Sequence, residues 1–205
     1  MTTKLGILIS GRGSNMQSIV RACSSGVVPA EVGVVISNRA DAAGLEWAAD
    51  HDIPTAVLSH KEFDTREAHD SAIVERLVGA GVEWVCLAGY MRLLSQAFID
   101  AFPNRILNIH PSLLPSFPGL HGQRDAYEYG VAVSGCTVHI VDLKLDHGPI
   151  VVQRSVPLEG CADADALADR ILIEEHKAYP SALARLLGEN WSIDGRRLVF
   201  HASSD

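Results

Sequence analysis

Several features that would mark the class of a protein are scarce or missing in this sequence. Aromatic residues make up only 6% of the chain, and 17 basic residues stand against 25 acidic ones, a formal net charge of -8. Because binding to a phosphate backbone needs clustered lysine and arginine, this charge disfavours a nucleic-acid partner. Any anion that the protein binds must therefore be held at a local site.

The four cysteines form no Cys-x-x-Cys pair, which argues against a zinc site or a thioredoxin-like motif, and we expect no metal. No apolar stretch approaches the roughly 18 residues that a membrane span needs. The apolar run near the N-terminus, residues 5–10, is too short for a secretory signal. We therefore expect a reduced, cytoplasmic protein without a membrane partner.

What the sequence does contain is a large apolar fraction, 47% of 205 residues, enough for one domain with a substantial core. Short β-branched runs alternate with amphipathic segments in the first half. This pattern predicts an α/β, Rossmann-like fold, with a mostly parallel sheet and helices on both faces. Strands are expected at 5–10, 32–37, 55–58, 84–88 and 105–109, and helices at 15–24, 42–50, 65–78 and 96–101.

The pattern changes after about residue 110, where a proline-rich, irregular loop begins. Two later strands are expected to pair antiparallel, so the C-terminal half adds antiparallel structure to the sheet. The expected elements are a loop at 111–119, strands at 136–141 and 150–156, a helix at 164–187 and a hairpin at 191–200. We expect a single domain, 1–205, with a first half of about 1–110 and a C-terminal half of about 111–205.

The sequence Gly11-Arg12-Gly13-Ser14-Asn15 joins the first expected strand to the first expected helix. Glycines let the backbone approach a ligand closely, and a helix N-terminus offers unpaired N–H groups to an anion. Met16 stands where a dinucleotide fingerprint has its third glycine, and no Gly-Lys-Ser/Thr follows, so a monophosphate suits the loop best. The alternative is a tight turn in which Ser14 or Asn15 only caps the helix.

Two polar residues, Asn108 and His110, end the fifth expected strand and project from the same face because they are two positions apart. Ligands of open α/β sheets bind at the carboxyl ends of strands. An amide and an imidazole there could both donate to an oxygen that gains negative charge. Asp146, 36 residues after His110, could orient the ring and favour its charged form. Asp146 could also be an ordinary turn residue, and His147 is a rival ring beside the same carboxylate.

Six motifs carry a resemblance to a known family. The first three are Asn108-Ile109-His110-Pro111-Ser112-Leu113-Leu114-Pro115, Pro118-Gly119-Leu120-His121 and Leu145-Asp146-x-Gly148-Pro149. The others are Gly11-x-Gly13-Ser14-Asn15, Gly89-Tyr90-Met91-Arg92 and Glu174-Glu175-His176-x-x-Tyr179-Pro180. Over about residues 4–200 the chain resembles the formyltetrahydrofolate-dependent transferases, and the last three motifs narrow the resemblance to members that formylate a glycinamide ribonucleotide.

The resemblance implies transfer of a formyl group from the co-substrate 10-formyltetrahydrofolate to the amine of 5'-phosphoribosylglycinamide, in purine biosynthesis. It implies that Asn108 and His110 stabilise the tetrahedral oxyanion, that Asp146 keeps His110 protonated, and that no metal takes part. His147 stands where a small residue is common in such proteins. The implied partners are small molecules, and the implied assembly is a monomer or a homodimer.

The resemblance also makes residues of about 1–110 the nucleotide- and phosphate-binding half and residues of about 111–205 the folate-binding and C-terminal half, and it assigns binding residues. It places the substrate phosphate at Gly13, Ser14 and Asn15, and the rest of the nucleotide at Leu172, Ile173, Glu174 and Glu175. It places the folate at Arg66, Met91, Arg92, Leu93, Leu94, Asn108, Asp142, Leu143, Lys144, Leu145 and Asp146.

Three alternatives remain. A formyltetrahydrofolate hydrolase uses a similar triad but usually carries an extra N-terminal domain, for which we expect no room before the first strand. A transferase acting on methionyl-tRNA typically adds a C-terminal nucleic-acid-binding domain, which we do not expect in a chain that stops at Asp205. A sugar-phosphate-binding module without catalysis is the alternative from another class.

Overall fold

The computed structural model describes residues 2–201, and the chain divides between Asn108 and Ile109 into two compact units. The first unit, residues 1–108, is built on parallel strands in the order β3-β2-β1-β4-β5. Its elements are β1 (Thr3–Ile9), α1 (Ser14–Ser24), β2 (Ala30–Ser37), α2 (Ala43–Ala49), β3 (Thr55–Val57), the 3-10 helix η1 (His60–Glu62), α3 (Arg66–Gly79), β4 (Trp84–Leu87), α4 (Gln96–Ala101) and β5 (Ile106–His110), whose last two residues lie beyond the division.

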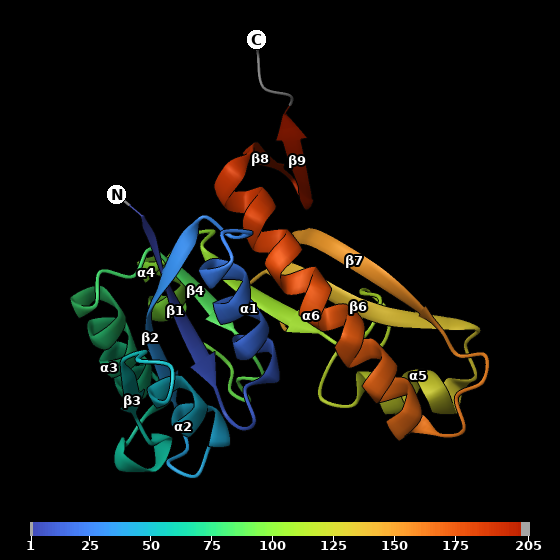
Figure 1. Ribbon diagram of the computed structural model, residues 1–205, viewed down its shortest axis with the longest axis horizontal. Coiled ribbons are helices and arrows are strands. Elements are labelled where there is room, and N and C mark those ends of the chain that lie inside the picture. The colour runs from blue at the N-terminus through green and yellow to red at the C-terminus, as the bar shows by residue number, and fades with distance from the viewer. Residues whose placement is uncertain (1, 202–205) are drawn as a thin grey trace. The chain divides into compact units, whose positions relative to one another are not determined.

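The central strands of this unit, β1 and β4, are buried on both faces, whereas the edge strand β3 has no buried residue. All of β4 and the last five residues of β1 are buried, as expected of continuous apolar runs in a parallel sheet. The strand order reverses between β1 and β4, so right-handed connections put α1 and α2 on one face and α3 and α4 on the other. In agreement with this arrangement, α1 packs against α2, and α3 packs against α4 (Figure 1). The predicted parallel sheet with helices on both faces is confirmed.

The second unit, residues 109–205, has the strand order β6-β7-β9-β8. Its elements are α5 (Gly122–Tyr129), β6 (Val133–Ile140), β7 (Ile150–Pro157), α6 (Ala164–Gly188), β8 (Asn190–Asp194) and β9 (Arg197–His201). β6 and β7 pair antiparallel, and β8 and β9 form a hairpin, so both predictions for this region are confirmed. β9 also pairs in parallel with the start of β7, and α6 packs along β6 and β7 (Figure 1).

Two short helices were not predicted from the sequence. α5 buries only Gly122 and Ala126, and the other side chains of its eight residues are too polar to give an apolar period of helical spacing. η1 has three residues, none of them buried. Over residues 2–201, no helix combines the length and the apolar character needed to cross a membrane.

Candidate active site

The loops after β1 and β4 lie at the point where the strand order of the first unit reverses, which is where open α/β sheets bind ligands. Ser10, just after β1, ties these loops together. Its backbone N–H donates to the Gly89 carbonyl at 3.2 Å, and its hydroxyl donates to Asn38 Oδ1 at 2.6 Å. The same hydroxyl accepts the backbone N–H of Met91 at 3.0 Å. Ser10 thus fixes the segment that was expected to hold the folate, a role that the sequence did not reveal.

The loop after β1 leads into α1 through Gly13, whose φ of 70° is in the left-handed region that favours glycine. Gly13 is the N-cap, and no side chain caps the helix. The alternative in which Ser14 or Asn15 caps α1 is therefore wrong, because the helix already begins at Ser14. No acidic residue lies in the first turn, and Arg12 precedes it, so the positive end of α1 is not neutralised by a local carboxylate.

The segment after β4 presents apolar side chains to solvent. Met91 is 65% exposed and Leu93 58%, whereas Leu94 is buried. Within residues 2–201, Arg92 Nε is a buried donor with no hydrogen-bond partner. Arg66, also expected to contact the folate, is the first residue of α3 and forms an exposed ion pair with Glu67 at 3.3 Å.

His110 ends β5 and is almost fully buried. Its Nε2 lies 2.8 Å from the Phe117 carbonyl oxygen, and its Nδ1 lies 3.4 Å from Asp146 Oδ2. The contact with Asp146 is the one expected from the sequence. The contact with Phe117 was not expected, because a backbone carbonyl has no signature in the sequence. Since both ring nitrogens face acceptor oxygens, only the imidazolium can donate to both.

Asp146 is held in place by more than His110. Its Oδ2 accepts the Gly119 backbone N–H at 2.8 Å, and its Oδ1 lies 3.8 Å from His139 Nε2. The backbone of Asp146 is left-handed, with φ at 49°, a conformation that aspartate tolerates better than most side chains. Asp146 therefore lies in a turn and is also a buried neighbour of His110, and its functional role stays a prediction.

His139 is a second imidazole at this carboxylate that the sequence analysis missed. It lies on β6, where the pairing with β7 shifts register between Val138 and His139, and such an irregularity redirects a side chain. Burial lowers the pKa of His139 below its ordinary value, although the hydrogen bond with Ile140 and the charge of Asp146 oppose the shift. In the sequence, His139 is one of three polar side chains of β6 with Ser134 and Thr137, so nothing in the pattern singled it out.

His147 does not compete for Asp146. Its Nδ1 lies 2.7 Å from Oδ2 of Asp142, at the other end of the same turn. The other carboxylate oxygen of Asp142 accepts the Lys144 backbone N–H at 3.0 Å. Leu143 and Leu145, which lie in the same turn, are 59% and 56% exposed.

The four α6 residues expected to bind the nucleotide do not face one direction. At roughly 100° per residue, Leu172–Glu175 cover most of the circumference of the helix. Ile173 is exposed, and Glu174 pairs with Lys177 at 2.6 Å and with Arg154 at 3.6 Å. Glu175 is buried, and its charge adds to the effect of burial in raising the pKa of the Cys136 thiol to about 12. Because it is buried, Glu175 differs from an ordinary helix carboxylate, which is exposed to solvent.

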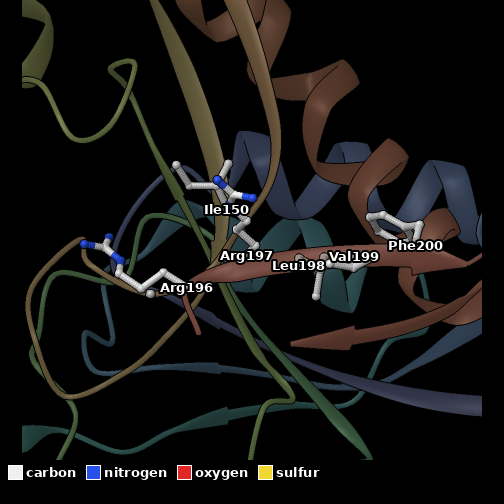
Figure 2. A pocket seen from close by; sticks show the side chains of 7 residues that line it. Ile150, Arg196, Arg197, Leu198, Val199 and Phe200 are labelled. Carbon is white, nitrogen blue, oxygen red and sulfur yellow. The ribbon is translucent and has the colours of Figure 1, made fainter. Parts of the chain in front are cut away.

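In the described part of the chain, no three His, Cys, Asp or Glu side chains are grouped in a way that could hold a metal ion. A cavity of about 580 Å³ lies between the start of β7 and β9 and is lined by Gly148, Ile150, Arg196, Arg197, Leu198, Val199 and Phe200 (Figure 2). None of these residues was a predicted site residue. The polar contacts of His110 and Asp146 lie outside this set.

The formyl transferase family matches residues 3–183 of this chain. The trifunctional purine biosynthetic protein adenosine-3 of Drosophila pseudoobscura pseudoobscura is 49% identical over 185 residues, which are 89% of this chain. The chain spans only 14% of the length of that relative. The phosphoribosylglycinamide formyltransferase of Escherichia coli (strain K12) is 42% identical over 190 residues, which are 93% of this chain and 87% of that protein.

A solved structure is similar over nearly the whole chain. Glycinamide ribonucleotide transformylase 1 from Symbiobacterium toebii has a TM-score of 0.95 and 48% sequence identity. The similarity covers 97% of this chain and 94% of that one. It therefore includes the strand that carries Asn108 and His110 and the turn that carries Asp146.

Proposed function

Because the chain belongs to the formyl transferase family, we propose that it transfers a formyl group from 10-formyltetrahydrofolate to the amine of 5'-phosphoribosylglycinamide, in purine biosynthesis. The observation that carries the catalytic assignment is the buried contact of 3.4 Å between His110 and Asp146 at the end of β5. Neither a hydrolase nor a binding module is favoured by the relatives. In this proposal the protein works in the cytoplasm on small molecules alone, as a monomer or a homodimer.

The chemistry begins with the amine of the nucleotide. Its lone pair attacks the formyl carbon, a C–N bond forms, and the formyl oxygen takes up negative charge. The intermediate collapses by breaking the bond to the folate nitrogen, and a proton passes from the attacking amine to that leaving nitrogen. We assign to Asp146 the assistance of this proton transfer, and to Asn108 a hydrogen bond to the oxyanion.

His110 is assigned the role of a buried donor to the oxyanion. Asp146 on one side of the ring and the Phe117 carbonyl on the other orient the imidazole, so that it can stabilise an oxyanion at this end of β5. Direct donation to the formyl oxygen requires the Nε2 bond to Phe117 to be exchanged for one to the substrate. A preorganised donor of this kind typically contributes a factor of about 100 to 1,000 in rate.

The binding residues remain those expected from the sequence. The N-terminus of α1 at Gly13, Ser14 and Asn15 suits one phosphate, which fits a protein whose net charge of -8 gives phosphates no general attraction. In the first unit, the exposed side chains of Met91 and Leu93 suit an apolar ring, and Arg92 Nε is a donor without a partner among residues 2–201. In the second unit, Leu143 and Leu145 are also exposed apolar side chains. The other proposed folate contacts are Arg66, Leu94, Asn108, Asp142, Lys144 and Asp146. The proposed nucleotide contacts on α6 are Leu172, Ile173, Glu174 and Glu175. We expect Glu175 to make the main contact with the nucleotide.

The test is an absorbance assay of 10-formyltetrahydrofolate consumption with and without 5'-phosphoribosylglycinamide. We expect consumption only when the amine is present, with one formylated product per tetrahydrofolate formed. Glycinamide without the ribose phosphate is the matched control, and it should react poorly because the α1 site is left empty. Consumption without any amine would identify a hydrolase, and binding without consumption would identify a non-catalytic module.

A further inference from the structure

The turn of residues 142–147 carries Asp146 and is closed by an internal pair. The Asp142 carboxylate bonds the His147 ring through one oxygen, at 2.7 Å, and the Lys144 backbone N–H through the other, at 3.0 Å. The two side chains of the pair, Asp142 and His147, are 40% and 33% exposed, so water weakens their attraction. The internal pair fixes the shape of the turn but anchors it to nothing outside.

An outside anchor comes from the C-terminal hairpin. Arg196, in the β8–β9 turn, donates a hydrogen bond from Nη2 to the carbonyl oxygen of His147, the residue next to Asp146. Arg196 is itself exposed, but hydrogen bonds from a charged donor are stronger than those between neutral groups. The next residue, Gly148, lies so close to the Ile140 carbonyl that a Cβ there would overlap it. Arg196 and Gly148 therefore hold the same end of the turn.

The hairpin is itself fastened to α6. Trp191 Nε1 donates to the Leu186 carbonyl at 3.0 Å, and the Arg185 guanidinium lies 3.6 Å from the centre of the Phe200 ring. These contacts give Arg196 a fixed base from which to hold the turn. The hairpin lies outside residues 3–183, the part of the chain that matches the formyl transferase family.

We propose that Arg196 is a positioning residue for formyl transfer: by holding the His147 carbonyl, it keeps Asp146 against His110. This inference rests on the proposed function. Asp146 must meet His110 at one oxygen and His139 at the other, and its left-handed backbone leaves little freedom in how the turn presents it. A displacement of about 1 Å in such a group can lower a rate by up to about 100-fold.

Arg197 provides the matched control. Arg196 lies in the β8–β9 turn and Arg197 is the first residue of β9, and in Figure 2 Arg197 points toward Ile150 whereas Arg196 points away from it. Arg197 lines the cavity between β7 and β9 and is exposed, and no hydrogen bond from its side chain to the turn is observed within residues 2–201. Removing either arginine changes the net charge equally, so a difference between the variants reports the bond to His147.

The experiment compares Arg196→Ala, Arg196→Lys and Arg197→Ala for kcat, KM and the pH dependence of kcat in formyl transfer. We expect Arg196→Ala to lower kcat on the order of 10-fold and to move the alkaline fall of kcat to lower pH, because a displaced Asp146 supports the His110 imidazolium less. Arg196→Lys, which keeps a charged donor, should recover part of both effects. Arg197→Ala should match the wild type.

Equal kcat and equal pH profiles for Arg196→Ala and Arg197→Ala would overturn the inference, as would a fall in kcat without a shift of the profile. If Arg196→Ala fails to fold, Arg196→Gln, which keeps a neutral donor, takes its place under the same criteria. A wild-type protein that consumes no formyl donor in the presence of the amine contradicts the proposed function instead, so the two failures are distinct.

Discussion

Each unit of the molecule contains a buried histidine–aspartate pair, and the two pairs share a bonding pattern. In α3, His69 Nε2 lies 2.9 Å from the Leu58 carbonyl and its Nδ1 lies 3.7 Å from Asp70. His110 has the same arrangement, with 2.8 Å to the Phe117 carbonyl and 3.4 Å to Asp146. Each carboxylate also accepts a backbone N–H. Asp70 accepts that of Ser95 at 2.6 Å, and Asp146 accepts that of Gly119 at 2.8 Å. The contacts differ in one detail, because in the described residues His69 Nδ1 is a buried atom without a hydrogen-bond partner, 3.7 Å from Asp70.

The setting of the two pairs differs. His69 and Asp70 are consecutive residues of one helix, and the Phe63 ring packs on His69 with 5.3 Å between ring centres. His110 ends a strand, and Asp146 comes from a turn 36 residues later. A pair fixed within one helix needs no other element to form it, whereas the second pair exists only when the turn is in place. We therefore assign a structural role to the first and a catalytic role to the second.

The largest effect that would test this comparison is on the rate. We expect His110→Ala to lower kcat for formyl transfer by about 100- to 1,000-fold, because it removes a preorganised hydrogen-bond donor beside the developing oxyanion. Binding of the nucleotide, measured by calorimetry, should change little, since its phosphate is assigned to the N-terminus of α1. His69→Ala is the matched variant, and its folded form should keep kcat within about 3-fold of the wild type. Equal losses in the two variants would remove the distinction between the pairs.

A smaller effect is expected on stability. Asp70→Ala leaves the Ser95 backbone N–H buried without its partner, so the free energy of unfolding should fall by about 1–3 kcal/mol. Urea denaturation followed by circular dichroism measures this loss. The kcat of the folded variant should stay near that of the wild type. A large loss of kcat with unchanged stability would show that the α3 pair also serves catalysis.

The smallest effect concerns the pH dependence of stability. Burial lowers the pKa of His139 in the folded state, so the unfolded state binds more protons as the pH falls below about 6.5. Stability is therefore lost toward acid, by at most about 1.4 kcal/mol per pH unit for this one group. His139→Gln should make the acid decline of the unfolding free energy shallower between pH 6.5 and 5, and an unchanged slope would contradict the assignment.

The sequence was sufficient where local pattern determines structure. The apolar runs of β1 and β4, the helix of residues 66–79 and the hairpin around Gly195 follow from periodicity and turn residues. It was insufficient where a backbone group is the partner: the Phe117 carbonyl beside His110 and the Gly119 N–H beside Asp146 depend on loop conformation. His139 was missed because the register shift in β6 that redirects it has no pattern of its own in the sequence.

The spacing of residues also could not decide which ring meets Asp146. His147 is adjacent in the chain but turns back to Asp142, while His110 and His139 arrive from two strands. The assignment of Asp146 to His110 came from the resemblance to known formyl transferases, and the contact of 3.4 Å agrees with it. The roles of Asn108, His110 and Asp146 remain predictions for experiment.

The pH dependence of kcat in Asp146→Asn, compared with the wild type, tests the central claim most directly. If Asp146 supports a catalytic imidazolium at His110, the neutral amide makes the ring lose its proton at lower pH. The alkaline fall of kcat should then move to lower pH, with kcat reduced throughout. A profile that keeps its position would contradict the claim that the Asp146–His110 pair carries formyl transfer.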